Sequence, residues 1–192
     1  MLLLIVGLSL FLGVHSISIV SPTLRARAVL RIGESAWKGL YALVSLVGFV
    51  LICYGFAQAR HTPVVLYSPP VWLHYLTLIL MLPVFPLILA AYLPGRIKTA
   101  AKHPMLAAIR LWAFAHLLAN GLLADVLLFG GFLVWAVFDR ISLKYRAIQQ
   151  VIRISSPRPW NDAIAMILGL ALYALTIGWV HVRLFGVSPL SL

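Results

Sequence analysis

The sequence predicts an all-α fold, a polytopic membrane helix bundle of about six transmembrane helices. The 192-residue chain is 63% hydrophobic and only 10% charged, and its mean hydropathy is +1.05. Soluble domains are about 45–50% apolar and about 25% charged. Several runs also reach the ~20 apolar residues that a membrane helix needs. At this length we expect residues 1–192 to form a single transmembrane domain.

Three long apolar runs each predict one membrane helix. The first covers residues 2–20 and has neither a basic start nor a small-residue cleavage site, so we expect an uncleaved helix rather than a signal peptide. The second covers residues 36–57, and the last in the chain covers residues 162–187.

A further apolar run, residues 70–92, contains three prolines. Pro70 suits the first turn of a helix, where its missing N–H is not needed. Pro83 and Pro86 lie inside the run and are expected to kink the helix, because proline cannot donate to the preceding turn.

The apolar stretch 105–138 is too long for one span, because a helix of that length would measure ~50 Å against a ~30 Å hydrocarbon core. Asn120-Gly121 is a turn signal in its middle. We therefore expect a short helical hairpin around this turn, with helices over about 105–119 and 122–138.

Basic residues test this helix count. Thirteen of the fifteen lysines and arginines fall in three segments. These residues are Arg25, Arg27, Arg31, Lys38, Arg96, Lys98, Lys102, Arg110, Arg140, Lys144, Arg146, Arg153 and Arg158. Six helices place all three segments on one side of the membrane, whereas five would place the last on the other. The positive-inside rule thus predicts six helices, basic loops in the cytoplasm and both termini outside.

The same rule explains the net charge of +11 without a nucleic-acid partner. The partner that the composition implies is the lipid bilayer. A single cysteine, Cys53, excludes an internal disulfide and a paired-cysteine metal or redox motif.

Five ionisable residues fall at predicted membrane depth, where such groups are costly and usually face the bundle interior. They are His15, His74, His116, His181 and Asp125. His61 and His103 lie at predicted helix ends. The sequence assigns no role to His61, His74, His103 or His181, although His74 and His181 are further candidate partners of Asp125.

His116 is predicted to lie near the bilayer midplane, and His15 near the basic end of the first helix, so both could approach one interior site. Asp125 and His116 are symmetric about the 120/121 turn, and the carboxylate could accept a hydrogen bond from the imidazole and orient it. Buried histidines of this kind could ligate haem iron, bind another metal, relay protons, or only hydrogen-bond a neighbouring helix. A non-haem metal site of the carboxylate type is not supported, because the sequence has no glutamate at membrane depth.

Several stretches resemble the NnrU family of bacterial membrane proteins. They are "FLGVHS" (11–16), "IGESAWKGLYALVSLVGFVLICYGF" (32–56), "AAYLPGRIKTAAKHPML" (90–106), "LWAFAHLLANGLLADVLLFGGFLVWAVFDRISLKYR" (111–146) and "GWVHVRLFGVSPL" (178–190). The resemblance implies a protein of the bacterial inner membrane that is associated with denitrification. The termini that the positive-inside rule places outside would then be periplasmic. Its partners would be membrane redox or denitrification proteins.

The family is similar to the plant zeta-carotene cis–trans isomerase, a membrane protein that uses haem b. The two histidine contexts of that relative match His15, in His15-Ser16, and His116, four residues after Trp112. The resemblance therefore implies haem b held by His15 and His116, and an isomerase-like redox reaction if the protein is an enzyme. Asp125, which the hairpin symmetry places beside His116, would then orient that ligand. Where the relative has a functional cysteine, this chain has Ala113.

Two alternatives remain at this point. One is a non-catalytic membrane accessory protein without a cofactor. The other is a membrane methyltransferase that uses S-adenosylmethionine, because Lys102-His103-Pro104 is similar to the Arg-His-Pro motif of that class. Those enzymes carry a glutamate pair after the hairpin, whereas the only glutamate here is Glu34.

Overall fold

The computed structural model describes residues 1–146 and 158–191, and this part of the chain consists of helices joined by non-helical connections, with no strand. By length and composition, five helical runs of these residues could each cross a membrane, and the apolar helix Pro104–Ala119 is shorter. The five runs are Leu2–Val20, Glu34–Ala59, Val71–Tyr92, Leu123–Tyr145 and Trp160–Phe185. This confirms the predicted membrane bundle. Residues 147–157, which belong to the predicted basic loop, lie outside the described residues.

The described chain divides into two compact units. Unit 1 comprises Met1–Leu66 and Leu122–Gln149, and unit 2 comprises Tyr67–Gly121 and Gln150–Leu192. The single domain over residues 1–192 stays a prediction.

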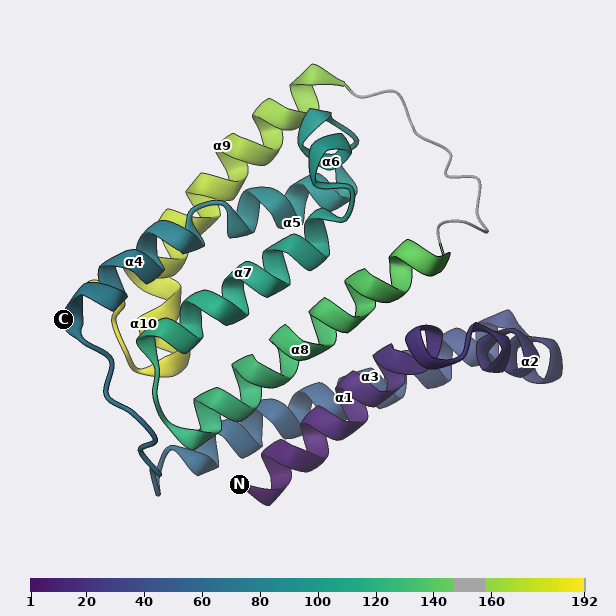
Figure 1. Ribbon diagram of the computed structural model, residues 1–192, viewed down its shortest axis with the longest axis horizontal. Helices are drawn as coiled ribbons and strands as arrows, with labels where there is room; N and C mark the ends of the chain where they lie inside the picture. Colours follow the sequence, from purple (N-terminus) through teal and green to yellow (C-terminus); the bar gives the residue numbers. More distant parts are fainter. Residues whose placement is uncertain (147–157, 192) are drawn as a thin grey trace. The chain divides into compact units, whose positions relative to one another are not determined.

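Unit 1 contains α1 (Leu2–Val20), α2 (Pro22–Ile32), α3 (Glu34–Ala59) and α8 (Leu123–Arg146). α1 lies along α3, and α8 packs on α1 (Figure 1). The predicted helices 2–20 and 36–57 are thus confirmed as α1 and α3. α1 has no charged residue, which suits a helix surrounded by lipid and by other helices.

Glycines bring the backbones of α1 and α3 together. A side-chain carbon added to Gly7 would lie 2.6 Å from the backbone nitrogen of Ile52, and one added to Gly48 would lie 2.8 Å from that of Phe11. Gly55 lies equally close against the backbone of Leu4. Since lipid is as apolar as a leucine side chain, such close packing is a main source of helix association in membranes.

Basic residues expected in loops lie on helices instead. Arg25, Arg27 and Arg31 belong to α2, which begins at Pro22 behind the Ser21 cap and ends at Gly33, where φ is +84°. Arg140 and Lys144 belong to α8, which extends beyond the predicted end at residue 138. α8 continues past its apolar part because no proline or glycine interrupts it there, whereas α2 is a separate helix that Ser21 caps and Pro22 begins.

Unit 2 contains the remaining helices, and Figure 1 shows the course of each. They are α4 (Val71–Met81), α5 (Val84–Tyr92), α6 (Arg96–Ala101), α7 (Pro104–Ala119), α9 (Pro159–Leu175), the π-helix η2 (Thr176–Val180) and α10 (His181–Phe185). α5 packs between α7 and α9, and α4 packs on α7. The predicted last helix, 162–187, is thus one run of three segments.

The predicted kink in the run 70–92 lies between α4 and α5, at Leu82 and Pro83. The backbone N–H of Leu82 donates to Ile79 at 3.2 Å instead of to the carbonyl one residue earlier. That earlier carbonyl, of Leu78, accepts the Tyr173 hydroxyl from α9 at 2.8 Å. A neighbouring helix thus satisfies a carbonyl that the kink has freed, as the absence of water in lipid requires.

Candidate functional site

His15 lies in α1 and is half-buried. Its Nδ1 lies 2.6 Å from the backbone carbonyl oxygen of Phe11, one turn earlier in the same helix. Because a carbonyl oxygen can only accept, Nδ1 carries the proton and donates it. The neutral ring then has its lone pair on Nε2, which is the atom that can bind a metal.

Aromatic rings surround the His15 imidazole. Phe11 stacks on it at 4.2 Å between ring centroids, Tyr41 of α3 lies at 5.1 Å, and Trp135 of α8 lies edge-on at 6.1 Å. Phe132 packs on Phe11 at 5.8 Å. We call Phe11, His15, Tyr41, Phe132 and Trp135 the His15 cluster. Three helices of unit 1 build this cluster.

His116 lies in α7 of unit 2, and its local arrangement repeats that of His15. Its Nδ1 lies 2.8 Å from the backbone carbonyl oxygen of Trp112, again one turn earlier. The Trp112 ring lies 5.5 Å from the imidazole, centroid to centroid. Nδ1 is therefore again the donor, and Nε2 carries the lone pair of the neutral ring.

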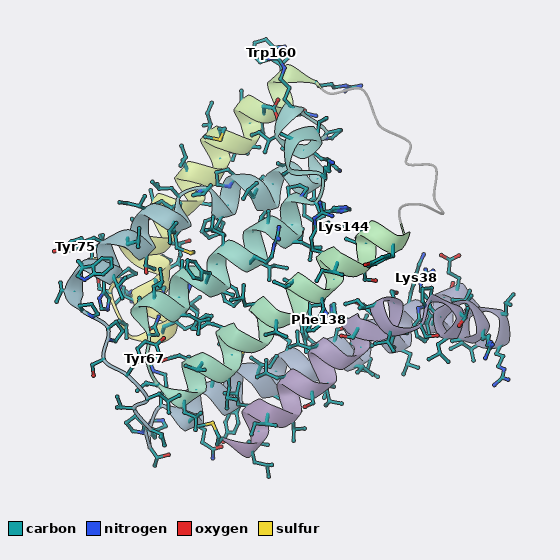
Figure 2. The ribbon with its side chains drawn as sticks, in the orientation of Figure 1. Lys38, Tyr67, Tyr75, Phe138, Lys144 and Trp160 are labelled. Atoms are coloured by element: carbon teal, nitrogen blue, oxygen red, sulfur yellow. The ribbon has the colours of Figure 1, made fainter. Side chains whose placement is uncertain are left out.

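The end of α7 just beyond His116 is held by side chains. The Asn120 amide donates to the His116 carbonyl at 2.9 Å. The Tyr67 hydroxyl contacts the carbonyls of Leu117 and Asn120, and Figure 2 shows Tyr67 beside this end of the helix. Gly121 lies so close to the Tyr67 backbone that no side chain would fit there. Asn120-Gly121 thus ends α7 in extended backbone, at the break that the sequence predicted, and both carbonyls accept hydrogen bonds from Tyr67.

Asp125 is the only buried charged residue in the described part of the chain, with 5% of its surface exposed. Its carboxylate accepts the backbone N–H of Leu122 at 3.1 Å, so it caps the start of α8. The sequence predicted that Asp125 would orient His116. In the structure the Trp112 carbonyl accepts the Nδ1–H of His116 and orients the ring. Asp125 belongs to unit 1 and His116 to unit 2, and a place for Asp125 beside a cofactor stays a prediction.

The other histidines lie as follows. Nδ1 of His74, in α4, is buried with no hydrogen-bond partner among the described residues. His181 begins α10 and its Nδ1 donates to the Val187 carbonyl at 2.7 Å. His61 lies exposed after α3, and His103 precedes α7.

Together these contacts define two imidazoles whose tautomer is fixed by the helix that carries each. Metal-ligating histidines commonly have this arrangement, with one ring N–H donated to a backbone carbonyl and the other nitrogen facing the metal. No cluster of three or more His, Cys, Asp or Glu side chains suited to a metal ion occurs in the described residues. The candidate metal ligands among the described residues are therefore single histidines rather than a cluster.

The sequence identified both histidines but not the rings around His15. Tyr41, Phe132 and Trp135 carry no motif, and their place beside His15 depends on how α3 and α8 are rotated against α1. The spacing of Phe11 and Trp112, each four residues before its histidine, was the available signal.

The fold and these polar residues define a multi-pass membrane protein with histidines inside its helical units. The NnrU protein family model matches residues 3–189. The chain therefore belongs to the NnrU family, as its motifs predicted. No curated protein and no solved structure matches the chain.

Proposed function

We propose that this NnrU-family protein binds haem b, with His15 and His116 as the axial ligands of one iron. The single observation that carries the proposal is the shared geometry of the two histidines. Each donates Nδ1–H to the carbonyl four residues earlier, at 2.6 Å and 2.8 Å. Each thereby keeps the lone pair of its neutral ring on Nε2, the nitrogen that coordinates haem iron when the other is hydrogen-bonded.

The donor set also suits haem more than a hydrated metal ion. Neutral imidazoles in apolar surroundings are typical axial ligands of haem iron, whereas Mg²⁺ and Ca²⁺ need several oxygen ligands. When bound, haem would supply a redox centre. We infer a role in nitrite or nitric oxide metabolism in the bacterial inner membrane, together with membrane redox or denitrification proteins.

The residues of the chain would do the remaining work. The carbonyls of Phe11 and Trp112 orient the two imidazoles and raise their basicity. The aromatic rings beside each imidazole would limit the access of water. In this proposal the carboxylate of Asp125 stabilises the start of α8 by accepting the backbone N–H of Leu122. A non-catalytic accessory protein without haem is the alternative, because the same hydrogen bonds would satisfy a histidine that only packs.

Substitution of the two histidines tests the proposal. We expect His15→Ala and His116→Ala each to abolish or shift the Soret and α/β bands of the detergent-purified protein. His61→Ala is the control, because His61 is exposed outside the helices. Free imidazole added to His15→Ala or His116→Ala should restore part of the spectrum. If the spectra of both variants equal that of His61→Ala, the proposed ligands are wrong.

A further inference from the structure

One buried hydrogen-bond donor in unit 1 has no acceptor. The indole nitrogen of Trp135, Nε1, is shielded from solvent and makes no hydrogen bond to any described residue. Indole nitrogen is a donor only, so it cannot be satisfied by a neighbouring N–H. A buried donor without an acceptor is costly, and tryptophan N–H groups usually find a partner when buried.

This donor belongs to the His15 cluster. The Trp135 ring lies edge-on to the His15 imidazole, with 6.1 Å between centroids and 87° between planes. Nδ1 of His15 is already bonded to Phe11, so the lone pair on Nε2 is the remaining polar atom of that ring. One cluster thus contains a lone pair suited to a metal and a donor suited to an oxygen, beside the rings of Phe11, Tyr41 and Phe132.

No residue supplies the missing acceptor in the described part of the chain, and lipid tails offer none. A ligand with an acceptor oxygen would satisfy the indole when it occupies the cluster. The flat rings of the His15 cluster favour a planar conjugated ligand that can stack on them. Haem meets both conditions, because its ring is planar and its edge carries two carboxylates.

We propose that the Trp135 indole N–H donates a hydrogen bond to a carboxylate oxygen of the haem that His15 holds. This inference rests on the proposed function. In this inference Trp135 recognises the carboxylate side chains of the porphyrin, whereas His15 binds its iron.

Haemin titrations of the full-length apoprotein test the inference, with haemin and haemin dimethyl ester as probes. Trp135→Phe should bind haemin roughly tenfold to a hundredfold more weakly, as expected for the loss of a hydrogen bond to a charged group. The loss should be smaller for the ester, whose oxygens are uncharged. Trp179→Phe is the matched control, because Trp179 is 55% exposed.

A second replacement guards against misfolding. A benzothiophene analogue of tryptophan at position 135 keeps the ring shape and removes only the N–H, so it should reproduce the Trp135→Phe result. The indole hydrogen-bond marker in ultraviolet resonance Raman spectra should shift when haemin binds to the wild type and not to the analogue.

The outcomes separate the two proposals. If the wild type binds no haemin, the proposed function fails. If it binds haemin while the benzothiophene analogue binds both probes as tightly as the wild type and the Raman marker does not shift, the role of Trp135 is overturned and the proposed function stands.

Discussion

At the scale of single residues, the chain satisfies polar groups within each unit rather than through water. His15 and His116 donate to their own helices, and Asn120 and Tyr67 close the end of α7. The exceptions among buried side-chain atoms of the described residues are Nδ1 of His74 and Nε1 of Trp135. Such exceptions mark positions where a bound group or an unseen partner is expected.

Asp162 makes a residue-scale prediction. Its carboxylate accepts the backbone N–H groups of Arg96 and Ile97, at 2.8 Å and 3.0 Å, and so caps α6 from α9. We expect Asp162→Ala to destabilise the protein by about 0.5–2 kcal/mol, as other lost helix caps do. Thermal unfolding in detergent measures the change.

Asp162→Asn is the matched variant, because it keeps one acceptor oxygen and should lose less stability than alanine. Equal unfolding temperatures for Asp162→Ala and the wild type would contradict the capping role.

The sequence could identify His15 and His116 because ionisable groups are rare in apolar runs and because these two match the histidine contexts of the haem-containing relative. It could not identify Trp135 or Tyr41 as neighbours of His15. Tryptophan and tyrosine are ordinary in membrane helices, and only the rotation of α3 and α8 against α1 decides which of them point inward.

At the scale of helices, close glycine contacts hold α1 against α3. A methyl group at Gly55 would collide with the backbone of Leu4, whereas one at Gly39, in the same helix, would meet nothing within 4 Å. We expect Gly55→Ala to destabilise the protein by about 1–3 kcal/mol through overpacking. Gly39→Ala should be neutral or stabilise by up to about 1 kcal/mol, because alanine favours helix.

Unfolding of both variants in the same detergent measures this difference. A Gly55→Ala protein as stable as Gly39→Ala would show that the approach of α1 and α3 does not depend on glycine.

Most helices were predictable from apolar length and from proline and glycine positions. The run 70–92, its kink and the turn at Asn120-Gly121 are examples. α2 and α6 were not predicted, because their sequences are basic and were interpreted as loops. In the structure Ser21 caps α2 and Asp162 caps α6. The π-helix Thr176–Val180 has no recognisable signal in the sequence.

At the scale of the whole molecule, α7 decides the topology. Its 16 residues would measure ~24 Å, less than a ~30 Å core. If α7 crosses together with the five long spans, both termini lie outside and Lys144 lies in the cytoplasm. We predict this arrangement because it keeps the basic segments on one side.

Cysteine labelling in intact cells checks the prediction, in a Cys53→Ala background because Cys53 is the only cysteine and is exposed. A cysteine at position 144 should react with an impermeant reagent only after the cells are opened, and one at position 190 should react in intact cells. Labelling of position 144 in intact cells would contradict the six-crossing arrangement.

The most direct test of the central claim is the haem content and spin state of the wild-type protein, purified from cells supplied with a haem precursor. Two axial histidines on one iron predict one haem b per chain and a low-spin, six-coordinate spectrum in both oxidation states. A colourless preparation that also fails to bind added haemin would contradict haem binding. Two haems per chain would contradict a shared iron.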